Sequence, residues 1–332
     1  MRLGTQSTLA EAPAHLRKHL PPNAHRRSAA DVPSPDGWTA APERGTDGAL
    51  RLMLWILRRL GWRAGHALLY PIAAYFLVSA PRQRAHARTY LRRALGREPG
   101  ARDLFRLWFA FASTILDRVF LASGQTAGYR FEIQGLDELK ATLAEGRGCL
   151  LLGAHLGSFE ALRAVADAGS PVELAVLMHQ ENAHRVQALA TAFGGARHAA
   201  AVIPLGTPDA MLRARECLQR GGMVGLLADR RPHGERVARV PFLGEPAPLP
   251  LGPHALGGML GAPVMLAFGI WEGPRRYRVR FEPFAGPEPL ERAGRNAAVR
   301  ERAARYAARV EEVCRAHPYN WFNFHDFWEE AR

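Results

Sequence analysis

A histidine and a glutamate five positions apart are the residues of this chain whose types and spacing best suit chemistry. The apolar run GCLLLGA leads into His155, and four residues separate it from Glu160. A carboxylate bonded to one imidazole nitrogen fixes the tautomer of the ring and raises the basicity of the other nitrogen. Such a pair would act as a general base toward a hydroxyl or an amine. A satisfied core histidine is the alternative interpretation.

The backbone limits how these two side chains can meet. Residues five apart on a regular helix point about 140° away from each other. We therefore expect His155 in the turn after a strand and Glu160 in the first turns of the following helix. Gly153 and Gly157 bracket the histidine, and glycine permits a tight turn. The carboxyl end of a strand is also where open α/β sheets bind their ligands.

Other kinds of catalytic site fit the sequence less well. A nucleophile elbow requires glycine two residues before and two residues after the serine, whereas Leu156 and Glu160 occupy those positions around Ser158. The HExxH pattern of zinc proteases is absent. The three cysteines form no CxxC pair and no cluster with histidine. The sequence therefore predicts no metal, no cofactor and no cysteine or serine nucleophile.

Polar residues after a later predicted strand are candidates for substrate binding. They are Asp229, Arg230, Arg231 and Arg236. Arginine grips phosphate through planar bidentate contacts, so we interpret the group as a docking patch for a phosphate or a carrier protein. Solvated surface arginines, with Asp229 and Arg230 as a structural ion pair, are the alternative. Asn182 is a further candidate, although an asparagine there equally suits a helix cap.

The elements that must position these residues alternate between apolar strands and amphipathic helices. The predicted strands cover 127–135, 148–155, 171–179, 200–206, 223–229, 262–272 and 276–284. The predicted helices cover 137–146, 158–169, 182–195, 208–222, 253–261 and 296–317. Continuous apolar strands indicate a sheet that is covered on both faces. We predict an α/β fold with a mixed, mostly parallel sheet flanked by helices over residues 126–332.

Two regions of different character precede this domain. Residues 1–48 are rich in Pro, Ala, Ser, Gly and Arg, which predicts a disordered arm. Residues 49–125 are interpreted as a membrane-associated helical region. No charged residue lies between Arg63 and Arg82, and arginines flank that span of roughly 18 residues. We expect a helix pair in the membrane interface; a full crossing and a buried core helix are the alternatives.

The formal net charge of +13 indicates anionic partners. Nucleic acid, an anionic membrane surface and phosphorylated ligands all satisfy that requirement. The arginines are dispersed through amphipathic helices, and no nucleic-acid-binding motif stands out. We therefore expect a membrane surface rather than nucleic acid, with a basic nucleic-acid-binding protein as the alternative.

The apolar strand that ends in GAHLGSFE resembles the His-x4-Asp/Glu motif of membrane acyltransferases. The chain is similar to the bacterial lipid A late (secondary) acyltransferase family, within the lysophospholipid acyltransferase superfamily. Further similarity lies in the arginine-rich anchor, in MHQENAHR, in the segment from GLLADRRPHG to GAPVMLAF and in the closing HPYNWFNFHDFW. It covers roughly Trp38 to Trp328. Many relatives have Asp-Gln in place of Asp229-Arg230, and the aromatic ending is similar to a subgroup of aryl-polyene-type pathways.

The resemblance implies a glycerolipid acyltransferase-like fold and acyl transfer from a thioester donor, either acyl carrier protein or acyl-CoA, to a hydroxyl or amine of a lipid-like acceptor. His155 would deprotonate the acceptor and Glu160 would orient the imidazole, so no covalent enzyme intermediate is needed. Gly157 and Ser158 would take part in substrate binding, and backbone N–H groups near Gly157 at the helix start, or an arginine, would bind the developing oxyanion. The implied location is the cytoplasmic face of the bacterial inner membrane, peripheral or with a single anchor. A catalytically inactive lipid-binding relative is the alternative.

Overall fold

The computed structural model describes residues 47–169, 172–179, 201–231, 235–289, 291 and 293–328. The predicted disordered arm lies almost entirely outside the described residues. Asn182 and the predicted helix 182–195 lie outside them as well.

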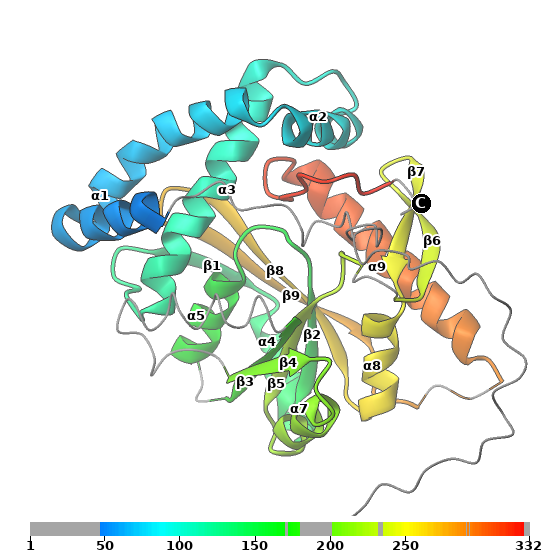
Figure 1. Ribbon diagram of the computed structural model, residues 1–332. Helices are drawn as coiled ribbons and strands as arrows, with labels where there is room; N and C mark the ends of the chain where they lie inside the picture. The colour runs from blue at the N-terminus through cyan, green and yellow to red at the C-terminus, as the bar shows by residue number, and fades with distance from the viewer. Residues whose placement is uncertain are drawn as a thin grey trace, which may run out of the picture. The chain divides into compact units, whose positions relative to one another are not determined.

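A sheet of seven strands forms the centre of the described chain (Figure 1). Its strands are β1 (Arg130–Gln134), β2 (Cys149–Gly153), β3 (Leu174–His179), β4 (Ala201–Leu205), β5 (Met223–Leu227), β8 (Val264–Gly273) and β9 (Arg276–Ala285). They are ordered β1-β9-β8-β2-β5-β3-β4. All neighbouring pairs are parallel except β8 and β9, which form an antiparallel pair. The predicted mixed, mostly parallel sheet is confirmed.

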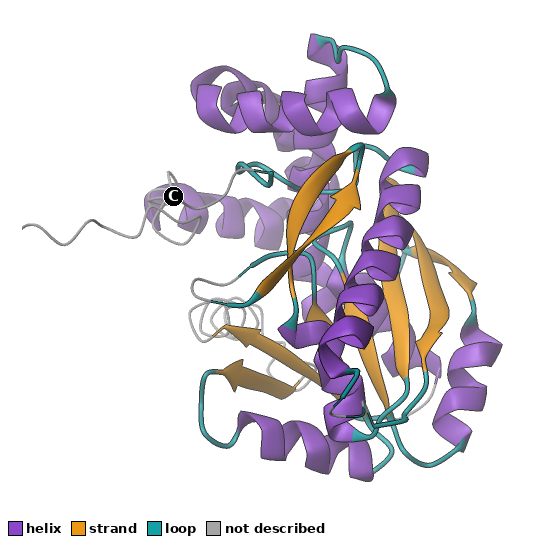
Figure 2. Cartoon of the chain, turned by 90° about the vertical axis from the view of Figure 1, so that its right-hand side faces the viewer, coloured by secondary structure: helices purple, strands orange, loops and turns teal. Residues whose placement is uncertain are grey.

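Helices cover both faces of this sheet (Figure 2). They include α4 (Leu136–Ala144), α5 (Phe159–Gly169), α7 (Ala210–Gln219), α8 (Gly252–Leu260) and α9 (Arg295–Ala316). Successive side chains of a strand point to opposite faces. Leu150 and Leu152 of β2 accordingly lie in a core with residues of α7 and α9. Cys149 and Leu151 lie in a second core with residues of α4 and α5. Burial on both faces explains why β2 is apolar throughout.

A two-stranded hairpin, β6 (Val237–Phe242) and β7 (Glu245–Pro250), was not among the predicted elements. Its turn residues Leu243 and Gly244 both have positive φ, at 51° and 85°, as a tight hairpin turn requires. Three of the six residues of β7 are prolines. Proline cannot donate to a strand ladder, and so the sequence of β7 does not look like a strand.

Three helices precede the sheet: α1 (Asp47–Ser79), α2 (Pro81–Leu95) and α3 (Ala101–Ala122). The backbone of α1 leaves helical geometry at Gly61, where φ is 72°. Within the described residues, no single helix has the length and apolar character needed to cross a membrane. Arg59–Ser79 and Pro81–Leu95, bent by 97° relative to each other, satisfy that requirement only as a pair. Association of this region with a membrane stays a prediction.

A buried carboxylate attaches these helices to the sheet. Asp117 of α3 is 1% exposed and accepts three hydrogen bonds. Its donors are the Trp62 indole of α1 at 2.7 Å, the Tyr129 hydroxyl at 2.7 Å and the Tyr277 hydroxyl of β9 at 2.8 Å. A buried carboxylate is tolerated only when such donors replace its water. Asp117 therefore fixes the position of α1 relative to β1 and β9.

We expect Asp117→Asn to destabilise the protein, because the amide nitrogen would face donors and leave buried groups unpaired. The cost should be about 3 kcal/mol, measured as the free energy of unfolding in urea. Asp137→Asn is the control, since Asp137 is exposed in the first turn of α4, and it should cost less than about 1 kcal/mol. Equal stability of the two variants would contradict the anchoring role of Asp117.

Candidate active site

His155 lies in the turn that follows β2, at the carboxyl edge of the sheet. β2 and β5 are parallel neighbours, with Gly153 opposite Leu227. Two residues beyond those positions, the chain reaches His155 after β2 and Asp229 after β5. Because parallel neighbours end at the same edge, the register alone brings these two residues together across 74 positions of sequence.

The Asp229 carboxylate holds His155 through both the ring and the backbone. Its Oδ1 lies 2.8 Å from His155 Nδ1, and its Oδ2 accepts the His155 backbone N–H at 3.0 Å. The Trp321 indole donates to the same Oδ2 at 2.9 Å. The side chain of Asp229 is 3% exposed, whereas that of His155 is 29% exposed. Asp229 thus holds the imidazole at Nδ1, and part of the ring remains exposed.

Glu160 has a different partner from the one expected. Its Oε1 lies 3.2 Å from Nε of Arg118 on α3, and its side chain is 10% exposed. The prediction that Glu160 is the carboxylate bonded to the His155 imidazole is therefore wrong, since Asp229 occupies Nδ1. Glu160 is the second residue of α5 and pairs with α3, which packs against α5.

The turn between β2 and α5 is packed closely against β8 and the C-terminal segment. Gly157 has a φ of 64°, and a Cβ atom there would lie 1.9 Å from the Gly269 carbonyl oxygen. The Gly157 N–H donates to the Asn320 carbonyl at 2.8 Å, and the Ser158 N–H donates to that of Gly269 at 2.7 Å. Backbone carbonyls thus occupy both amides, and an oxyanion role for the amides near Gly157 stays a prediction.

The hydroxyl of Ser158 stabilises the start of α5. Ser158 is 2% exposed, and its Oγ accepts the Ala161 N–H at 3.3 Å in the first turn of α5. The structure therefore places Ser158 beneath the turn rather than in a position to touch a substrate.

The predicted arginines separate into one that belongs to the site and two that lie further along the chain. Arg230 donates to the Phe322 carbonyl at 2.9 Å, and burial lowers its pKa while the charge of Asp229 raises it. Arg231 is half-buried, and Arg236 is exposed at the base of the hairpin, where its carbonyl accepts the Leu251 N–H. Within the described residues, no group of three or more His, Cys, Asp or Glu residues could hold a metal ion.

The surroundings of the pair favour a neutral imidazole beside an ionised carboxylate. Burial and the charge of Arg230 lower the pKa of His155 below its usual value of 6.5, against the charge and hydrogen bond of Asp229. Burial acts to raise the pKa of Asp229, but the contacts with His155, Arg230 and Trp321 hold it well below its usual range. Because an ionised carboxylate accepts hydrogen bonds and cannot donate one, the imidazole proton lies on Nδ1. The lone pair of Nε2 is then available as a base.

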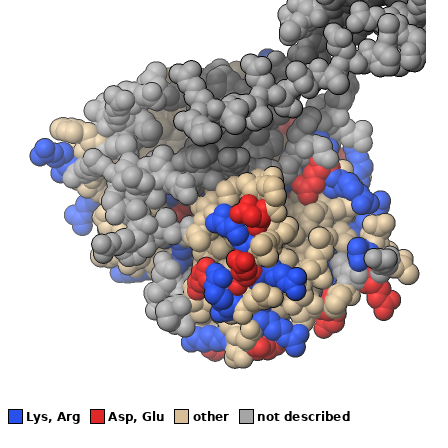
Figure 3. Space-filling model, turned by 60° about the horizontal axis from the view of Figure 1, so that its bottom comes forward, with Lys and Arg blue, Asp and Glu red and all other residues tan. Residues whose placement is uncertain are grey.

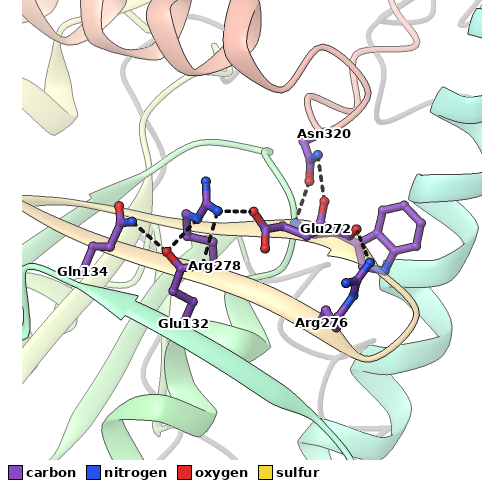
Figure 4. A network of polar contacts seen from close by, with 7 residues as sticks. Glu132, Gln134, Glu272, Arg276, Arg278 and Asn320 are labelled. Atoms are coloured by element: carbon purple, nitrogen blue, oxygen red, sulfur yellow. Dashed lines mark hydrogen bonds and ion pairs between the residues drawn. The ribbon is translucent and has the colours of Figure 1, made fainter.

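Sequence reasoning missed the contribution of the C-terminal segment, residues 319–328, to this site. Trp321 is 1% exposed and reaches Asp229, as described above. Asn320 bonds with its side-chain amide to the backbone of Trp271 on β8 (Figure 4). Phe322 N–H donates to the His155 carbonyl at 3.0 Å. The only signal in the sequence was the density of aromatic residues, which indicates core packing but not contact with His155 or Asp229.

Residues 39–330 of the chain match the family described as bacterial lipid A biosynthesis acyltransferase. The chain belongs to this family, as the resemblance of its motifs indicated. The activity of the family is acyl transfer to a lipid-like acceptor. No curated protein matches the chain.

The contact between Asp229 and His155 leads to a prediction that requires no activity measurement. Asp229→Asn removes the charge that favours the imidazolium, so we expect the pKa of His155 to fall further below 6.5. NMR titration of the ring resonances, assigned by comparison with His155→Gln, measures the shift. In Glu160→Gln the change should be smaller, because Glu160 is paired with Arg118. A larger shift in Glu160→Gln than in Asp229→Asn would contradict the assignment.

Proposed function

We propose that this protein is an acyltransferase in which His155, oriented by Asp229, is the general base. The observation that carries the proposal is the 2.8 Å contact between Nδ1 of His155 and the buried Asp229 carboxylate. Together with the lowered pKa of the imidazole, it supports a base that is neutral and correctly oriented at neutral pH.

The proposed reaction is a direct transfer. Nε2 of His155 takes the proton from the acceptor hydroxyl or amine as its oxygen or nitrogen attacks the carbonyl carbon of the thioester. The new C–O or C–N bond forms, the C–S bond of the tetrahedral intermediate breaks, and the imidazolium returns the proton to the leaving thiolate. Asp229 stabilises the imidazolium between these steps. The products are an ester or amide and a free thiol.

The surroundings of the site support a mechanism without an acyl-enzyme intermediate. Cys149, Cys217 and Cys314 are all buried, and burial raises the pKa of Cys149 to about 12. A protonated, buried thiol is a poor nucleophile. Ser158 is buried and caps α5.

Positive charge near His155 supports stabilisation of the oxyanion by arginine. Both Arg230 and Arg118 disfavour the imidazolium through their charge. The same charges favour negative charge that develops on the thioester oxygen. Arginine, rather than the occupied amides of Gly157 and Ser158, is thus the proposed source of oxyanion stabilisation.

The proposed substrates are a thioester of acyl carrier protein or coenzyme A and a lipid-like acceptor at the cytoplasmic face of the bacterial inner membrane. Support for a membrane site comes from large apolar side chains that α1 exposes, namely Trp55, Leu60, Tyr70, Tyr75 and Val78. Tryptophan and tyrosine favour the membrane interface. Because the C-terminal segment is aromatic, an acceptor of the aryl-polyene type is one of the proposed candidates.

Acyl transfer from an acyl carrier protein thioester to a bacterial lipid extract, followed by mass spectrometry, tests the proposal. We expect His155→Ala to lower kcat by about a thousandfold or more and Asp229→Asn by a similar factor, because the wrong tautomer is then favoured. Glu160→Gln should lower kcat by a smaller factor. Circular dichroism checks that each variant folds. Full activity in a folded His155→Ala variant, or an acyl group retained on the protein, would overturn the mechanism.

The pH dependence of kcat/KM follows from the environment of His155. The base works only when neutral, and its pKa lies below 6.5. Activity should therefore be unchanged from pH 8 until the pH approaches this lowered pKa, and it should fall tenfold per pH unit below the pKa. Asp229→Asn should move the remaining acid limb to still lower pH. A limb centred above pH 7 would show that another group, or a protonated His155, controls the rate.

A further inference from the structure

Four arginines surround a hollow of about 350 Å³ that lies apart from His155, between α1 and the turn joining β8 and β9. It is lined by Trp62, Arg63, Gly128, Arg130, Pro274, Arg275 and Arg276. None of the four arginines forms an ion pair with a carboxylate in the described part of the chain. The hollow therefore concentrates positive charge that no acidic side chain among the described residues neutralises.

The strand register places two of these charges side by side. Arg130 of β1 is paired with Arg276 of β9, and like charges on facing positions repel. Two residues further along, the same strands pair Glu132 with Arg278, which form an ion pair at 3.2 Å. Figure 4 shows that Glu272 also turns its carboxylate to Arg278, at 2.8 Å. Among the described residues, Arg276 donates to the Glu272 carbonyl, at 3.4 Å, and to no carboxylate.

The turn between β8 and β9 presents Arg275 to the hollow. Its φ of 53° is in the left-handed region, as a tight turn between two antiparallel strands requires. Its guanidinium lies over the Trp62 ring at 4.6 Å and the Tyr129 ring at 5.3 Å. Its Nε is buried and has no hydrogen-bond partner in the described part of the chain. A buried donor without a partner indicates a missing acceptor.

The base of the hollow is rigid because Asp117 fixes it. Trp62 and Tyr129, the rings beneath Arg275, both donate to Asp117 at 2.7 Å. The charge of Arg275 is thus presented on a fixed platform, whereas Arg63, Arg130 and Arg276 are exposed at the rim. Convergent guanidinium groups suit the tetrahedral oxygens of phosphate better than a single carboxylate.

The position of the hollow favours a lipid as the source of that phosphate. Trp62 and Arg63 belong to α1, which also exposes the apolar side chains named above, including Leu60 two residues before Trp62. Apolar and aromatic side chains beside arginine are typical of a surface that lies in the headgroup region. The face shown in Figure 3 differs, because basic and acidic side chains adjoin one another there.

We propose that this arginine hollow binds the phosphate of an anionic membrane lipid headgroup. Arg63, Arg130 and Arg276 close around the phosphate from the rim, and Arg275 contacts it from the base. The proposal concerns binding and does not depend on the role proposed for His155, so a failure of either leaves the other testable.

Binding of the purified full-length protein to vesicles tests the proposal. One set contains phosphatidylglycerol in phosphatidylcholine, and a second carries the same surface charge on the carboxylate of cholesteryl hemisuccinate. The variant is the triple substitution Arg63→Gln, Arg130→Gln and Arg276→Gln. The matched control is Arg147→Gln, Arg215→Gln and Arg300→Gln, which removes three exposed arginines outside the hollow. Thermal unfolding checks that both triple variants are folded.

We expect the hollow variant to bind phosphatidylglycerol vesicles about tenfold more weakly or worse than wild type, while the control variant changes by less than about threefold. The two variants should differ far less in their affinity for hemisuccinate vesicles. Equal losses in both variants, or equal losses of the hollow variant on both kinds of vesicle, would show that charge alone matters and would overturn the proposal. Inorganic phosphate that stabilises the wild type and displaces the vesicles at millimolar concentration would identify a free-phosphate site and overturn the lipid assignment.

Discussion

The burial of one carboxylate, that of Asp229, determines the arrangement of the whole carboxyl edge of the sheet. An ionised carboxylate that is removed from water costs several kcal/mol unless donors surround it. Asp229 obtains its donors from the backbone and ring of His155 after β2 and from the Trp321 indole near the C-terminus. The contacts that make this burial tolerable are also the contacts that orient the imidazole. The burial of Asp229 and the orientation of the His155 ring therefore depend on the same interaction.

Buried carboxylates with several donors recur where separate parts of the chain must be joined. Asp103 of α3 accepts from the Arg97 guanidinium, the Gly100 N–H and the Tyr319 hydroxyl, and so attaches the C-terminal segment to α3. Asp117 attaches α1 to β1 and β9 in the same way. Apolar packing alone is tolerant of sliding, whereas a carboxylate with directional donors accepts one arrangement. The helices before the sheet and the segment after it are thus fixed at defined positions.

The sheet could be predicted because its strands are apolar runs separated by amphipathic helices, and His155 could be placed because it ends such a run. Glu160 was chosen as its partner because it is near in sequence. The correct partner, Asp229, also ends an apolar run, but only the order of strands shows that β2 and β5 are neighbours. Trp321 could not be assigned, because the C-terminal segment has no periodicity. The proline-rich β7 was missed for the reason that proline is rare in strands.

Adjacent residues of α3 connect the arginine hollow with the turn that carries His155. Asp117 holds Trp62 and Tyr129 beneath Arg275, and Arg118 pairs with Glu160 at the start of α5. β8 is parallel to β2 and continues past its carboxyl end, so the turn that carries His155 and, further out, the β8–β9 turn that carries Arg275 both lie toward the carboxyl edge of the sheet. A headgroup in the hollow would therefore hold this edge toward the membrane. An acceptor would then meet Nε2 of His155 at the lipid surface, where its own acyl chains remain solvated by the bilayer.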